Sequence, residues 1–89
     1  MNVPNLDCLD SSDLESFAVK WESRASRADC AALVGTGRGY TVLARTLGHY
    51  ARNKLTAMQC RARGDIRGAQ MYEGICERIF SGLPDHARW

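Results

Sequence analysis

The sequence has no long apolar run, and this absence excludes an integral membrane protein. No apolar stretch approaches the ~18 residues that a membrane-spanning helix needs. The first residues also lack the basic and then apolar pattern of a secretory signal, so we expect a cytoplasmic protein. With 89 residues, 45% of them hydrophobic and 25% charged, the composition is that of a single small domain over residues 1–89.

Metal-ligand spacing is absent as well. The chain has four widely separated cysteines: Cys8, Cys30, Cys60 and Cys76. There is no C-x-x-C pair and no H-x₃₋₅-H motif, so we expect reduced thiols that act as small buried apolar residues. A zinc site made from Cys60, Cys76 and one histidine, His49 or His86, is conceivable but has no support in the spacing. We therefore predict no metal and no cofactor.

The sequence also lacks a catalytic constellation. No nucleophile, base and acid occur with a local spacing that would join them. The acidic residues lie in the N-terminal part or, like Glu73 and Glu77, one helical turn apart. His49 is expected on a polar helix face and His86 in the tail. We therefore predict no catalytic residues and a protein that is not an enzyme.

Apolar residues do recur with helical spacing, and the first such segment covers residues 12–34. Its apolar stripe consists of Leu14, Phe17, Ala18, Trp21, Ala25 and Ala28. Ser12 and Glu15 form a capping box that predicts the start of this helix. The last apolar residues of the segment fall off the stripe, which predicts a bend or restart near residue 28.

Two further helices are predicted, over residues 41–63 and 65–83. Gly64 between them favours a left-handed end of the second helix, and Asp65 can cap the third. So short a connection between two long amphipathic helices forces an antiparallel hairpin. The predicted fold is all-α: a small three-helix domain with a long antiparallel helical hairpin. Its flanking segments are an extended N-terminal stretch and a tail, 1–11 and 84–89.

The pattern G-D-I-x-x-A-x-x-Y that begins at Gly64 resembles the inter-helix turn of a tetratricopeptide repeat. In that family glycine makes the turn and a small alanine lets the second helix pack closely. The resemblance extends from Thr56 to Leu83, but Asn53 replaces a large aromatic residue and Ala57 replaces the usual glycine. There is one copy, whereas solenoids need about three. The resemblance implies a peptide- or protein-binding scaffold.

A glycine-rich stretch, G-T-G-R-G over residues 35–39, separates the first two predicted helices. Glycines let backbone N–H groups approach an anion at a helix N-terminus, so a phosphate-binding loop is one interpretation. However, the dinucleotide fingerprint needs glycine at Tyr40, no Gly-Lys-Ser/Thr follows, and no strand precedes. A flexible loop is the favoured interpretation, with Arg38 at its centre able to contact a phosphate or carboxylate.

Charge is distributed unevenly along the chain. Residues 1–37 have six acidic and three basic side chains, a balance of −3, and residues 38–68 have seven basic side chains against one acidic, a balance of +6. Residues 69–89 contribute −1, which gives the total of +2. This asymmetry favours a basic face that meets an acidic partner, either another protein or a second copy of the chain.

Four polar residues of the second predicted helix share one face, opposite its apolar arc. This basic ridge consists of Arg45, His49, Arg52 and Arg63. Guanidinium groups form bidentate contacts with carboxylates and phosphates. Three interpretations stand: a solvated face, a surface for an acidic protein, and a nucleic-acid-binding face whose affinity falls steeply with salt. The absence of aromatic residues between these positions disfavours nucleic acid.

Three large side chains need a separate explanation. Lys54 and Arg61 fall beside the apolar arc, where Glu73 or Glu77 across the hairpin can pair with them. Trp89, in the tail, either folds back onto the hairpin or anchors an interface, a position in which tryptophan is enriched.

Together these features predict a non-catalytic protein-interaction module, of the kind found among small accessory and inhibitor proteins of phages and mobile elements. The candidate contact residues are the basic ridge, Arg38 and Trp89. The predicted partner is a protein with an acidic surface or a second copy of the chain. We predict no binding to a membrane. The alternative is a nucleic-acid-binding protein that uses the same ridge.

Overall fold

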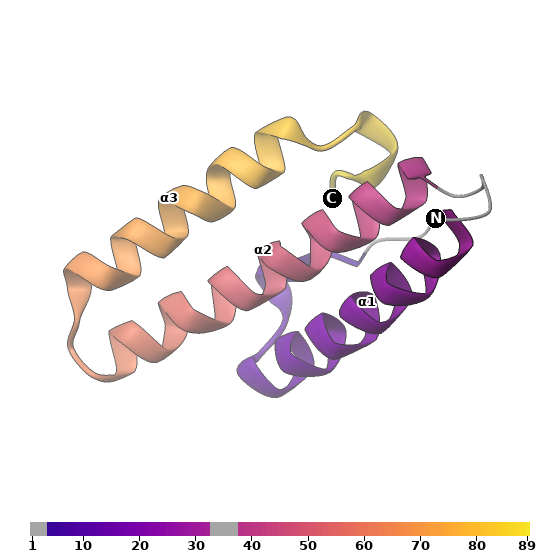
Figure 1. Cartoon of the computed structure of the whole chain (residues 1–89). Helices are drawn as coiled ribbons and strands as arrows, with labels where there is room; N and C mark the ends of the chain where they lie inside the picture. The colour runs from indigo at the N-terminus through magenta and orange to yellow at the C-terminus, as the bar shows by residue number, and fades with distance from the viewer. Residues whose placement is uncertain (1–3, 33–37) are drawn as a thin grey trace.

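The structure, a computed structural model, describes residues 4–32 and 38–89 and contains three long helices in these ranges (Figure 1). The elements, in chain order, are the 3-10 turn η1 (Leu6–Cys8), α1 (Ser11–Ala32), α2 (Arg38–Ala62), α3 (Ile66–Gly82) and the 3-10 turn η2 (Asp85–Ala87). No strand occurs in either range. The prediction of an all-α, three-helix domain is confirmed.

Helix α2 lies in the middle of the fold, with α1 along one side and α3 along the other, both antiparallel to it (Figure 1). The extensive helix–helix contacts are α1 with α2 and α2 with α3. Small residues at steps of three and four, Ala44, Gly48 and Ala51, let α1 approach α2 closely; a Cβ at Gly48 would lie 3.6 Å from Cγ of Glu22. The three helices therefore form one layer. One side of α2 belongs to each of the two faces of this layer.

Asp10, and not Ser12, caps the start of α1. Its Oδ1 accepts a hydrogen bond from the N–H of Asp13 at 2.8 Å, and its carbonyl oxygen accepts one from the N–H of Leu14 at 2.9 Å. Aspartate is as good an N-cap as serine. The helix consequently begins at Ser11, one residue before the predicted capping box.

Two predictions about the region between α1 and α2 are wrong. Helix α1 is continuous through residue 28, where a bend was expected. Helix α2 begins at Arg38, before the expected cap at Thr41, so part of the expected loop is helical. A glycine such as Gly39 costs a helix only about 1 kcal/mol relative to alanine, which tertiary packing overrides. The expected end of α1 and the first two glycines of the stretch, within 33–37, lie outside the described residues.

The turn between α2 and α3 has the predicted form. Gly64 has a φ of 81°, which is the left-handed conformation that favours glycine. The N–H of Asp65 donates to the carbonyl oxygen of Cys60 at 2.8 Å and so satisfies the end of α2. The Asp65 side chain then accepts from the N–H of Gly68 at 3.0 Å and caps α3. This turn fixes the antiparallel hairpin.

The core follows the two helix–helix contacts and extends to both ends of the chain. Its largest fully buried side chains are Leu6, Leu14 and Leu47. Leu6 belongs to η1, which interrupts the segment expected to be extended over 1–11. The N-terminal segment crosses behind α2 in Figure 1, so it covers one face of the layer.

Among the three cysteines whose side chains the structure describes, exposure differs from the prediction at one; the side chain of Cys30 lies outside the described part. Cys60 and Cys76 are buried free thiols, as expected, but Cys8 is exposed because η1 turns Leu6 inward and leaves Cys8 at the surface. Among the described helices, none combines the length and apolar character needed to cross a membrane.

Candidate functional site

The basic ridge lies at the surface of α2. Arg45, His49 and Arg63 are exposed and Arg52 is half-buried, so none of the four side chains is taken into the core. At ~1.5 Å per residue the ridge is ~27 Å long from Arg45 to Arg63. We call this side of α2, and the face of the layer to which it belongs, the ridge side.

An ion pair joins the middle of the ridge to α1. Nε of Arg52 lies 2.6 Å from Oε1 of Glu22, and its Nη2 lies 3.2 Å from Oε2, so the contact is bidentate. The hydrogen bonds from Arg52 lower the pKa of Glu22. Glu15 of α1 also acts electrostatically on Arg52. A row of acidic side chains from α1 therefore borders the ridge.

The remaining candidate contact residues do not join the ridge into one patch. Trp89 is half-buried against the hairpin, where its ring packs edge-on to those of Tyr50 and Phe80, each with centroids 4.8 Å apart. The first of the two alternatives for Trp89 is thus the observed one. Arg38 opens α2, but its side chain lies outside the described part of the structure.

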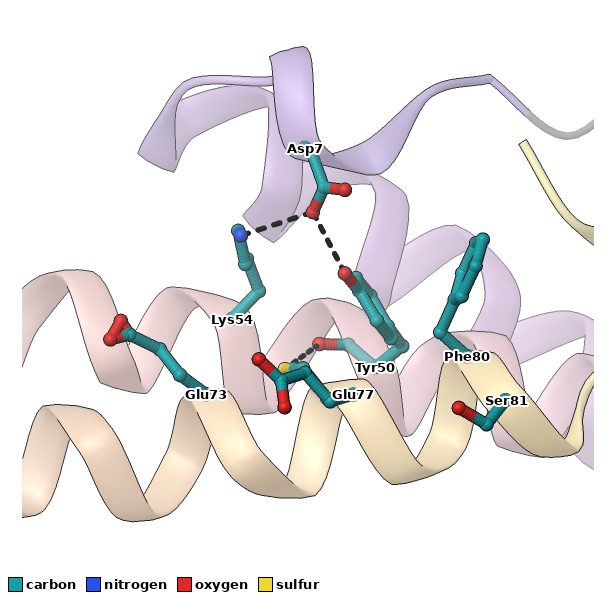
Figure 2. A pocket seen from close by; sticks show the side chains of 8 residues that line it. Asp7, Tyr50, Lys54, Glu73, Glu77, Phe80 and Ser81 are labelled. Carbon is teal, nitrogen blue, oxygen red and sulfur yellow. Dashed lines mark hydrogen bonds and ion pairs between the residues drawn. The ribbon is translucent and has the colours of Figure 1, made fainter.

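The opposite side of α2 is occupied by both ends of the chain, and we call it the covered side. Asp7 is the central residue there (Figure 2). Its Oδ1 accepts a hydrogen bond from the Tyr50 hydroxyl at 2.8 Å and lies 3.0 Å from Nζ of Lys54. Its Oδ2 accepts from Nε1 of Trp89 at 3.2 Å. One carboxylate thus ties the N-terminal turn, α2 and the C-terminal residue together.

This environment shifts three acid–base groups. Partial burial by itself raises the pKa of Asp7, but the hydrogen bonds from Tyr50, Lys54 and Trp89 outweigh it and the pKa is lowered. Burial and then the bond to Asp7 raise the pKa of Tyr50. Burial also raises the pKa of Cys76 to about 11, so this thiol stays protonated at neutral pH. Its Sγ donates to the carbonyl oxygen of Tyr50 at 3.7 Å.

A groove of about 570 Å³ lies beside Asp7, between the N-terminal turn and α3 (Figure 2). The residues that line it are Asp7, Tyr50, Lys54, Glu73, Cys76, Glu77, Phe80 and Ser81. The prediction that Arg61 pairs with Glu73 is confirmed, since Nε and Nη2 of its guanidinium both donate to that carboxylate. Lys54 pairs instead with Asp7, which the sequence analysis did not single out.

Lys54 is nevertheless the signal that points to Asp7. A lysine beside an apolar arc needs a carboxylate nearby, and the facing helix is only one of the segments that can supply it. The partner comes from a turn 47 positions earlier in the chain, which no helical periodicity can place. The covered side is therefore the cluster of paired polar side chains that reasoning from spacing missed.

Among the side chains that the structure describes, which exclude those of residues 26–41 and 86, no three histidine, cysteine or acidic residues cluster around a common point. Comparison with known proteins found no matching family model, no matching curated protein and no matching solved structure. The function is therefore inferred from the residues of this chain alone.

Proposed function

We propose that the protein is a non-catalytic interaction module that binds an acidic surface of another protein through the basic ridge of α2. The observation that carries this proposal is the contrast between the two sides of that helix. On the covered side, charged groups such as Lys54 and Asp7 satisfy each other. On the ridge side, Arg45, His49 and Arg63 are exposed, and Nη2 of Arg63 donates to Sγ of Cys60 at 3.5 Å.

The ridge is better suited to a protein than to a nucleic acid. A phosphate backbone brings negative charge along its whole length and favours an uninterrupted positive surface. Here the guanidinium of Arg52 is paired with the carboxylate of Glu22, and Glu15 interacts with Arg52 electrostatically. Adjacent acidic and basic rows are instead the pattern by which protein surfaces select a partner and its orientation.

Affinity capture tests the proposal. The tagged protein is used as bait in lysates of the cells that produce it, with and without nuclease treatment, and retained proteins are quantified. The bait variant Arg45→Glu/Arg63→Glu reverses two charges of the ridge. A matched control, Arg67→Glu/Arg78→Glu, makes the same change in charge at two exposed positions of α3.

The expected result is an identified protein that wild type and the control variant retain equally and the ridge variant loses. Equal retention by all three baits would contradict the proposal. Retention that disappears after nuclease treatment, and that falls steeply with salt, would support the nucleic-acid alternative instead.

A further inference from the structure

The ridge side of the layer presents three parallel rows of side chains, one from each helix. Glu22 of α1 pairs with Arg52, which places the acidic row beside the ridge. On α3, Glu73, Glu77 and Ser81 line the groove of the covered side. The helical period therefore turns the opposite flank of α3 toward the ridge side.

That flank of α3 is apolar. Met71, Ile75 and Ile79 recur at steps of four along it, and Tyr72 lies three positions before Ile75. Met71 is 55% exposed, and the other three are half-buried. Single exposed apolar residues are normal on a protein surface. A continuous row that borders a row of arginines is an amphipathic surface.

The seam between the ridge and this apolar row is bordered by polar side chains of α2. Three polar side chains of α2 fold back onto their own helix: Thr46, Asn53 and Thr56 donate to the carbonyl oxygens of Val42, His49 and Arg52 at 2.7–2.9 Å. Their donors are satisfied within the helix, so a partner that lies here has few buried polar groups to compensate. Arg61 and Lys54 face the covered side and pair there with Glu73 and Asp7.

Electrostatics determine which seam a partner can occupy. Over the α1–α2 seam an acidic partner would meet Glu15 and Glu22, and like charges oppose docking. Over the α2–α3 seam it meets arginines on one flank and apolar side chains on the other. An acidic partner is thus directed to the α2–α3 seam.

We propose that the α2–α3 seam binds an acidic amphipathic helix, whose apolar stripe packs on Met71, Ile75 and Ile79 and whose acidic flank faces the basic ridge. This proposal rests on the proposed function and specifies its partner. Helix-in-groove recognition uses anchors at i, i+3, i+4 and i+7. The ridge of ~27 Å corresponds to a partner helix of about 18 residues at ~1.5 Å per residue.

Two designed peptides of about 18 residues serve as probes. Both have the same leucine stripe, and one has glutamate on its flank where the other has lysine. Fluorescence anisotropy gives the affinities, and amide chemical shifts map the contacts. The glutamate peptide is expected to bind about tenfold more tightly than the lysine peptide, since reversing the flank places like charges together. Equal affinity, or a preference for lysine, would overturn the proposal.

Matched variants locate the site. Met71→Ser is expected to weaken the glutamate peptide about fivefold, whereas Val19→Ser, at a similarly exposed apolar residue of α1 (51% against 55%), is expected to have no effect. Arg45→Ala/Arg63→Ala should weaken it about tenfold, and Arg67→Ala/Arg78→Ala should not. Equal losses in test and control variants would contradict the assignment to this seam.

The two proposals can fail separately. If the peptides do not discriminate but the charge-reversed ridge still loses its captured protein, the helical partner is wrong and the ridge function stands. If the glutamate peptide binds the seam but the ridge variant still captures the same protein, the seam binds acidic helices and the proposed function of the ridge is wrong.

Discussion

The two sides of α2 carry charges of the same kinds but use them differently. On the covered side, Asp7 accepts hydrogen bonds from Tyr50 and Trp89 and pairs with Lys54. On the ridge side, Arg52 has a carboxylate partner, while the imidazole of His49 has no hydrogen bond or ion pair in the described structure. The difference arises because both chain ends lie over one face only.

This contrast separates stability from binding. Groups that satisfy each other across long sequence distances hold segments in place, whereas exposed ion pairs contribute little to stability. Substitutions on the covered side should therefore change the free energy of unfolding, and substitutions on the ridge should not. Each of the following experiments tests this contrast.

The largest effect is expected in the core. Leu47 is fully buried, so Leu47→Ala should lower the free energy of unfolding by about 2–5 kcal/mol through lost burial and the cavity left behind. Val42→Ala, on the same helix at a residue that is 63% exposed, should change it by less than about 0.5 kcal/mol. Urea unfolding followed by circular dichroism measures both. Similar losses would show that the helix is packed differently.

Trp89 should contribute next. Trp89→Ala removes the packing on Tyr50 and Phe80 and the hydrogen bond to Asp7, and should destabilise the fold by about 2–3 kcal/mol. Trp89→Phe keeps a ring but lacks the N–H donor, so its unfolding free energy should lie between those of wild type and Trp89→Ala. Because Trp89 lies on the covered side, retention of the captured protein should be unchanged wherever the variant is folded. A stable Trp89→Ala protein that loses its partner would instead make Trp89 an interface anchor.

Asp7→Asn should destabilise by about 1–2 kcal/mol at neutral pH, the size expected for hydrogen bonds to a charged group that is partly solvated. Glu77→Gln, on the same groove but without a hydrogen bond or ion pair in the described structure, is the matched control and should be nearly neutral. Equal effects would mean that net charge, and not the contacts of Asp7, matters.

The stabilising effect of Asp7 should decrease as the pH falls. Its pKa is lowered from 3.8 in the folded state, so the folded protein favours the ionised form. The contribution is therefore fully present above pH 3.8 and is lost as pH falls through the lowered folded value. The difference in unfolding free energy between wild type and Asp7→Asn should shrink over that range. A constant difference would contradict the role of the ionised carboxylate.

The smallest effect should come from the ion pair on the ridge. A double-mutant cycle with Arg52→Ala and Glu22→Gln should give a coupling free energy of about 0.5 kcal/mol, because both side chains are largely solvated. The coupling should decline further in 1 M salt, where the Debye length is about 3 Å. A coupling free energy well above 1 kcal/mol would show that this ion pair of the ridge stabilises the fold.

Much of the hairpin could be predicted from sequence because its determinants are local. Gly64 and Asp65 specify their turn through backbone conformation and a cap only three residues away. Periodicity likewise identified the buried residues Trp21 and Cys76. The start of α1 was displaced because Asp10 and Ser12 are equally good caps, and spacing alone does not choose between them.

The covered side could not be predicted in the same way. It depends on a short turn, η1, that buries Leu6 and carries Asp7 across the layer. Neither residue belongs to a repeating pattern. The sequence analysis also expected one apolar arc on α2, whereas α1 and α3 pack on two different flanks of it. Long-range placement, and not local propensity, therefore determines which charged residues stay available for a partner.

The most direct test is the unfolding free energy of the triple variant Arg45→Ala/His49→Ala/Arg63→Ala. Since all three side chains are exposed, we expect a value within about 1 kcal/mol of wild type, as for other surface substitutions. A loss of several kcal/mol in the unfolding free energy would show that these three residues stabilise the fold, which would contradict the separation of binding from stability.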